Sequence, residues 1–143
     1  MKKTARTYDG RVRKPVKELV EGIQFDSQFE AQVYRHLRML FPKEQITCHE
    51  AVPILPETPY FKGRDWKCDF KVTLPNRWQP IYVEAKGVNT AEFKLLLQTL
   101  GYTNASVIQN LLVVHSEIGI KLGKTIQTVN IHHMYQYLLR FKQ

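Results

Sequence analysis

The chain has 143 residues, of which 43% are hydrophobic and 11% aromatic, so its composition is that of one globular domain and excludes a disordered or fibrous protein. Lys and Arg number 21 against 13 acidic residues, and the resulting net charge of +8 favours a polyanionic partner, nucleic acid above all. No apolar run approaches the roughly 20 residues of a membrane span, the basic first residues lack the apolar stretch of a secretory signal, and two cysteines make no disulfide framework. We therefore expect a cytoplasmic protein with no membrane and no small-molecule substrate.

Residues 1–17 are strongly basic, with seven Lys or Arg and a single acid, Asp9. We expect them to form an arm that lies along phosphates, followed by a single domain over residues 18–143. A solvated tail without a partner would have the same composition. The candidate phosphate contacts in this arm are Arg11, Arg13 and Lys14.

The stretch FDSQFEAQVYRHLRMLFP predicts the first helix. Asp26 or Ser27 can cap its start by accepting a backbone N–H, and Pro42 prevents its continuation. Apolar residues at positions 29, 33, 37 and 40 repeat with helical spacing, so one face of the helix should pack inward. The following ITCHEAVPILP is strand-like, but its prolines favour an edge strand or an early end.

Residues 66–86 predict a β-hairpin because apolar residues alternate in both halves and PNRWQP supplies a turn. The even-numbered residues 66–74 should share one apolar face of the first strand. With the turn centred near residues 76–77, the numbers of opposing residues sum to about 153. Asp69 would then face Glu84, and Lys71 would face Tyr82.

The rest of the chain predicts a helix from NTAEFKLLLQTLGY, with Asn89 or Thr90 as its cap and Gly101 as its stop. NLLVVHS reads as a short buried strand, residues 119–123 as a turn, and IHHMYQYLLRF as a closing helix. This order of elements predicts an α/β domain with a central mixed sheet flanked by helices.

The predicted hairpin gathers three ionisable side chains. Asp69 and Glu84 oppose each other, and Lys86 is a diagonal neighbour of Asp69. Directly opposed like charges destabilise a sheet, so a cation should offset them. Two cations fit: the ammonium group of Lys86, or a divalent ion such as Mg²⁺ or Mn²⁺ held by the carboxylates. The structural alternative is a surface ion cluster with no chemistry.

Asp69, followed after fourteen residues by Glu84-Ala85-Lys86 on a neighbouring strand, resembles the PD-(D/E)XK nuclease superfamily, whose fold is restriction-endonuclease-like. Glu30 in FDSQFEAQVYRHL resembles that superfamily's helical acidic residue. The layout is similar to small phage nucleases and to the transposon-end-cleaving nuclease domain over roughly residues 22–115. Cys68 stands where the motif's proline would be, a position that varies within the superfamily.

The resemblance implies a role for each of these residues. Asp69 and Glu84 would bind Mg²⁺ or Mn²⁺ with help from the backbone carbonyl of Ala85, and Glu30 would hold a water of the metal shell or a second ion. Lys86 would orient the attacking water or stabilise negative charge at phosphorus. Further nucleic-acid contacts are expected from Lys94, Arg64, Lys71 and the turn residue Trp78.

Other interpretations of single residues stay open. Glu30 could be a helix-edge carboxylate paired with Tyr34 or Arg35. Asp65 competes with Asp69 as the ligand, although it lies in a predicted loop. A zinc site of Cys48-His49 with Cys68 lacks the usual ligand spacing.

These features predict a metal-dependent DNA endonuclease, phage-encoded by resemblance, that acts in DNA processing, recombination or degradation. A Holliday-junction or branched-DNA resolvase is the alternative, and resolution by two symmetric nicks would require a homodimer. A nuclease acting on RNA, a non-catalytic DNA-binding module and a subunit of a larger assembly are further alternatives.

Overall fold

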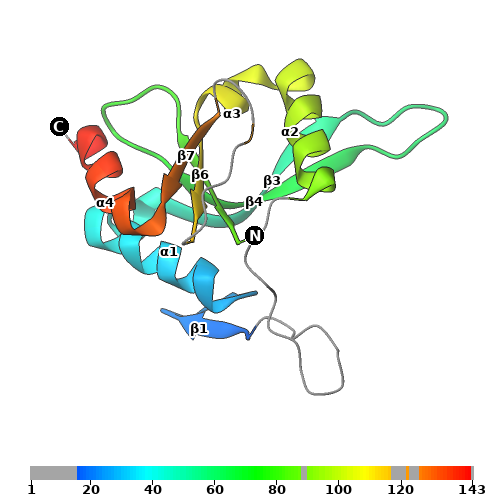
Figure 1. Ribbon diagram of the computed structural model, residues 1–143. Coiled ribbons are helices and arrows are strands. Elements are labelled where there is room, and N and C mark those ends of the chain that lie inside the picture. The colour runs from blue at the N-terminus through cyan, green and yellow to red at the C-terminus, as the bar shows by residue number, and fades with distance from the viewer. Residues whose placement is uncertain (1–15, 88–89, 117–121, 123–125, 143) are drawn as a thin grey trace, which may run out of the picture.

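The protein is an α/β domain built on a five-stranded mixed sheet, as predicted (Figure 1). The structure, a computed structural model, describes residues 16–87, 90–116, 122 and 126–142. The strand order is β3-β4-β5-β6-β7; β3, β4 and β5 are antiparallel neighbours, whereas β5, β6 and β7 are parallel. The strands are β3 (Ile46–Leu55), β4 (Arg64–Val72), β5 (Ile81–Lys86), β6 (Leu111–His115) and β7 (Gln127–Asn130).

Helices cover both faces of this sheet, and each face has its own apolar core. Helices α1 (Gln28–Leu40) and α4 (Ile131–Leu139) pack against each other and contribute to one core cluster. Helices α2 (Ala91–Thr103) and α3 (Ala105–Gln109) contribute to the other. Strand β6 serves both clusters, since Leu112 and Val114 belong to the first and Leu111 and Val113 to the second.

Smaller elements complete the chain. A two-stranded hairpin of β1 (Glu18–Val20) and β2 (Ile23–Phe25) precedes α1 and lies against it. Short 3₁₀ segments occupy Lys43–Gln45 and Arg140–Lys142. Among the helices of the described residues, none has the length and apolarity needed to cross a membrane.

Helix α1 begins and ends where the sequence predicts. Of the two candidate caps it uses Ser27, whose hydroxyl accepts the backbone N–H of Glu30 at 3.1 Å. The helix ends before Pro42, and its apolar stripe is buried in the first core. The cap therefore fixes Glu30 in the first turn of the helix, at the end that lies nearest the site described below.

The register predicted for the β4–β5 hairpin is confirmed, with Phe70 opposite Val83 and Lys71 opposite Tyr82. Strand β3 is an edge strand, as its prolines indicated. It does not end early, however: it runs to Leu55 and absorbs the irregularity in a register shift between Pro53 and Leu55.

Two expectations for the middle of the chain are wrong. Gly101 lies inside α2, which continues to Thr103 and is closed by Asn104. The even-numbered residues of β4 do not share one apolar face, because Cys68 packs into the second core and Phe70 into the first. Strand β4 thus changes faces at Asp69, a distortion that strict alternation cannot reveal.

Candidate active site

The candidate site is built where α1, β3, β4 and β5 approach one another. Glu30, from the first turn of α1, is only 6% exposed although it is a carboxylate. Its Oε1 lies 2.5 Å from Nε2 of His49 on β3. Since a buried carboxylate needs a partner, this contact explains how Glu30 is accommodated next to the core.

His49 reaches Glu30 because the backbone of β3 is distorted at this residue. Its φ is 57°, in the left-handed region that costs a non-glycine residue about 1–2 kcal/mol. Cys48 pairs with Phe70 and Glu50 with Cys68, so His49 stands across from Asp69, the residue at which β4 also changes faces. Strained backbone of this kind persists where the surroundings enforce it, often at functional sites.

Asp69 and Glu84 are joined through the main chain of each other's strand. The backbone N–H of Asp69 donates to Oε2 of Glu84 at 3.1 Å, and the N–H of Ala85 donates to Oδ2 of Asp69 at 2.9 Å. Regular β4–β5 pairing extends only to Phe70 and Val83, so beyond it the two carboxylates accept the N–H groups that a regular ladder would pair. The strands therefore separate at the point where the acids stand.

Burial and mutual repulsion raise the proton affinity of both acids. Burial, followed by the nearby Glu30 carboxylate, raises the pKa of Asp69 to about 7. Burial and the Asp69 carboxylate raise the pKa of Glu84 well above its usual range. Glu84 is only 6% exposed, although it alternates with the apolar residues Val83 and Ala85 of β5. The site thus holds more negative charge than its own cations balance.

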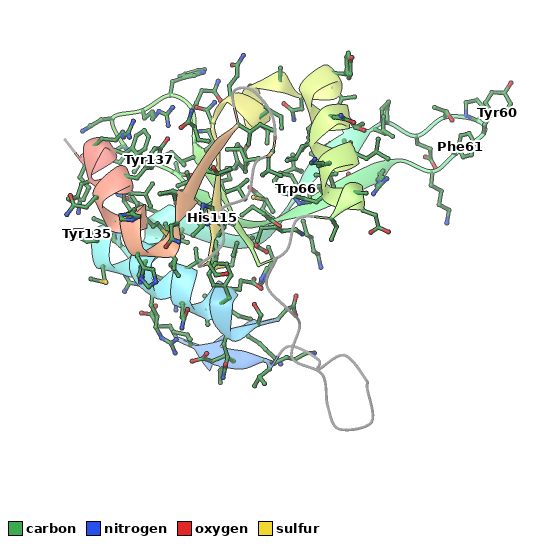
Figure 2. All side chains as sticks on the ribbon, in the orientation of Figure 1. Tyr60, Phe61, Trp66, His115, Tyr135 and Tyr137 are labelled. Carbon is green, nitrogen blue, oxygen red and sulfur yellow. The ribbon has the colours of Figure 1, made fainter. Side chains whose placement is uncertain are left out.

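The ammonium group of Lys86 acts on both acids and lowers the pKa of each, to a smaller extent than burial raises it. Its Nζ lies 4.4 Å from the centroid of the Phe93 ring, in the first turn of α2. On the neighbouring strand β6, His115 is the backbone partner of Lys86. His115, labelled in Figure 2, is buried, and its Nδ1 lies 3.0 Å from the carbonyl oxygen of Ser116. Strand β5 and helix α2 together therefore fix the position of Lys86.

Three of these side chains could hold a metal ion. Ligand atoms of Glu30, His49 and Asp69 all lie within 4.8 Å of one another, close enough to coordinate one cation. Two members of the predicted ligand set, Glu30 and Asp69, belong to this group. Glu84 does not belong to it, although its carboxylate accepts the Asp69 N–H, and Ala85 contributes its N–H to the Asp69 carboxylate.

His49 is the residue that the sequence interpretation missed. It appeared there only in a weak zinc pattern with Cys48 and Cys68. Burial raises the pKa of Cys48 to about 11, and the Cys68 thiol donates to the carbonyls of Phe70 and Val83, so neither thiol is disposed to ionise as a zinc ligand. Had residues 46–55 been paired with residues 64–72 as a second hairpin, His49 would have been placed opposite Asp69.

The alternative partners suggested for Glu30 are engaged elsewhere. Tyr34 donates to Glu21 at 2.8 Å, and Arg35 forms an ion pair with Glu18. Asp65 is exposed on the projecting part of β4, away from the three-residue cluster. Asp69 is therefore the aspartate of the site.

The predicted nucleic-acid contacts are scattered over the surface. Arg64 and Lys94 are exposed on β4 and α2, and Trp78 is exposed in the β4–β5 turn. Lys71 forms an ion pair with Glu50, with 3.0 Å between Nζ and Oε2. Arg11, Arg13 and Lys14 lie outside the described residues, as does most of the predicted basic arm.

Comparison of the chain with known protein families, with curated proteins and with solved structures found no significant match.

Proposed function

We propose that the protein is a metal-dependent DNA endonuclease of the PD-(D/E)XK type, with a restriction-endonuclease-like fold. One observation carries the proposal. Acids from three separate elements (Glu30, Asp69 and Glu84) converge where β4 and β5 separate, and Lys86 stands beside them. Concentrating buried acids is unfavourable for folding, and such clusters with raised pKa values are typical of functional sites.

The donor set fits a divalent cation. Two carboxylates and an imidazole lie within reach of a single ion. The pKa of Asp69 is raised by burial and by the nearby Glu30 carboxylate, and an ion would neutralise this negative charge. Carboxylates suit Mg²⁺ and Mn²⁺, while the imidazole of His49 favours a transition-metal ion, so Mn²⁺ should bind more tightly than Mg²⁺. When bound, the ion would polarise a phosphoryl oxygen and lower the pKa of a water near the scissile bond.

The chain's own residues would position the reactants and stabilise charge. The N–H of Ala85 fixes the carboxylate of Asp69. Nε2 of His49 and Oε1 of Glu30 contact each other, and a bound ion would take the place of this contact. The ammonium group of Lys86 would stabilise the charge that develops on the phosphoryl oxygens, a contribution commonly worth about 10²–10³ in rate. Hydrolysis adds water across one P–O bond and leaves a phosphate monoester and a hydroxyl group.

The net charge of +8 supports a polyanionic substrate, and DNA is the nucleic acid we propose. The test is cleavage of supercoiled plasmid in Mn²⁺ or Mg²⁺, with a chelator as the metal-free control. We expect wild-type protein to nick the plasmid only with metal, and Asp69→Asn, Glu84→Gln and Lys86→Ala to lose at least about 100-fold in rate.

The matched control comes from the same strand. Asp65→Asn changes an exposed residue of β4 and should cleave as the wild type does. If the wild type binds DNA with a steep salt dependence but cuts no duplex, junction or RNA in any metal, the enzyme proposal is wrong and a binding module remains. Cleavage of RNA alone would keep the mechanism and change the substrate.

A further inference from the structure

The hairpin formed by β3 and β4 projects from the body of the domain and ends in two exposed aromatic side chains (Figure 1, Figure 2). Tyr60 is 87% exposed and Phe61 is 79% exposed. Figure 2 places both at the far end of the projection, away from the helices. Large aromatic side chains are usually buried in cores or interfaces, so two adjacent exposed ones suggest a binding role.

The end of the hairpin is an ordered turn. Residues 58–63, here called the aromatic tip, are closed by the N–H of Thr58, which donates to the carbonyl of Phe61 at 2.9 Å. The Thr58 hydroxyl accepts the N–H groups of Tyr60 and Phe61 at 3.2 and 3.0 Å. The two rings are thus presented by a preorganised backbone, which lowers the entropy lost on binding.

Gly63 shows that the tip is also closely packed. A Cβ at this position would lie 3.2 Å from the backbone N of Glu57 and 3.2 Å from the carbonyl oxygen of Leu55. A side chain at this position would require the backbone of residues 55–57 to shift by a few tenths of an ångström, so glycine suits the close approach of the two strands before the turn. The geometry of the tip is therefore set by its own backbone.

Three cations lie in or near the tip in the sequence. Lys62, Arg64 and Lys67 are exposed on the same arm, and within the described part of the chain none of them forms an ion pair. Residues 57–67 hold these three cations and two acids, Glu57 and Asp65, so the segment carries one net positive charge. Aromatic rings flanked by cations are the combination that binds unpaired nucleotides, because bases stack on the rings and phosphates meet the cations.

We propose that the aromatic tip is a stacking wedge for unpaired bases, which directs the enzyme to branched, looped or single-stranded DNA. This inference rests on the proposed function for the identity of the polyanion. An intact duplex hides its base faces in the stack, whereas a branch point or gap exposes them to an inserted ring. The tip therefore distinguishes DNA structures without reading sequence.

DNA binding, measured in the presence of a chelator so that no DNA is cut, tests the wedge separately from cleavage. The probes are a four-way junction and a linear duplex of the same sequence, each carrying 2-aminopurine, whose fluorescence reports changes in stacking; it is placed at the branch point in the junction. We expect Tyr60→Ala and Phe61→Ala each to weaken junction binding by about fivefold or more and to abolish the fluorescence change. Duplex binding should change less than about twofold, since it depends on phosphate contacts.

Tyr102→Ala is the matched control, because Tyr102 is a fully exposed aromatic residue of α2. It should bind both probes as the wild type does. Phe61→Trp should retain junction binding, which separates loss of stacking from a general disturbance of the tip. The tip residues are exposed, so unchanged thermal unfolding of the variants will show that they fold.

Equal junction binding by Tyr60→Ala, Phe61→Ala and the wild type would overturn the wedge and point to a protein partner for the tip. Failure of the wild type to prefer the junction to the duplex would overturn it as well. The two proposals fail in different ways. If the wild type cuts no DNA but the tip variants bind the junction more weakly than it does, the wedge stands and the nuclease proposal is wrong. If the wild type cuts DNA and the tip variants bind and cut the junction equally well, the nuclease proposal stands and the wedge is wrong.

Discussion

Asp69 donates its backbone N–H to the carboxylate of Glu84, while its own carboxylate accepts the N–H of Ala85 on the same neighbouring strand. Two acids that would repel each other are thereby held side by side by main-chain donors. Such an arrangement positions both carboxylates without neutralising them. Their charge is left for a cation to balance.

The first prediction concerns how the stability of the folded protein depends on pH. Burial and the Glu30 carboxylate raise the pKa of Asp69 from its usual 3.8 to about 7, and the pKa of Glu84 is raised also. The folded state therefore binds more protons than the unfolded state between about pH 4 and pH 7, so the free energy of unfolding falls as pH rises through that range. Metal-free wild type should melt at a lower temperature at pH 8 than at pH 5.

Neutralising one acid should remove part of this penalty. At pH 8, in chelator, Asp69→Asn should melt about 3–5 °C above the wild type, equivalent to ~1 kcal/mol. The difference should shrink towards pH 5. Asp65→Asn, an exposed change on the same strand, should show neither effect. A wild type whose melting temperature rises from pH 5 to pH 8 would contradict the electrostatic account of the site.

The second prediction concerns metal binding. A cation that binds only the folded protein stabilises it by mass action, by about 2.7 kcal/mol at 100 times the dissociation constant. Mn²⁺ should therefore raise the melting temperature, more at pH 8 than at pH 5.5, because protons compete for Asp69. Differential scanning calorimetry with Asp69→Ala as the control measures this. An equal Mn²⁺ shift in that variant would place the ion elsewhere.

Much of this site was predictable because it depends on local signals. A cap at Asp26 or Ser27 predicted a helix start just before Glu30, and the alternation in β4 and β5 predicted the register that brings Asp69 near Glu84. What escaped prediction depends on tertiary contacts. The left-handed backbone of His49 and the change of faces at Asp69 leave no periodic trace, and strands as short as β1 and β7 gain their stability from packing against the rest of the domain.

The third prediction separates the backbone of His49 from its imidazole. Because φ is 57° at this residue, His49→Gly relieves strain that His49→Ala retains. The free energy of unfolding of the glycine variant should therefore exceed that of the alanine variant by about 1 kcal/mol, and the glycine variant should unfold at a higher urea concentration. Both variants lose the ring and should bind Mn²⁺ at least about tenfold more weakly than the wild type. Urea titration and isothermal calorimetry measure the two effects. Unimpaired Mn²⁺ binding in both would remove His49 from the ligand set.

The fourth prediction concerns how Lys86 is held. Its ammonium group lies 4.4 Å from the centroid of Phe93, a contact worth about 0.5–2 kcal/mol depending on its exposure to solvent. Phe93→Leu keeps an apolar side chain in the second core but removes the ring, so Lys86 gains freedom to leave the acids. We expect kcat for plasmid nicking to fall about 3–10-fold, with DNA affinity unchanged.

Leu97→Val is the control for this change. Leu97 is buried in the same helix and the same core as Phe93, but it has no aromatic ring that could hold Lys86. The substitution should lower the free energy of unfolding by about 1 kcal/mol and leave kcat unchanged. If both variants slow cleavage equally, general loosening of α2 explains the effect. A selective loss in Phe93→Leu would instead mean that a residue of the apolar core aims the lysine, so that packing of α2 and catalysis are coupled through a single ring.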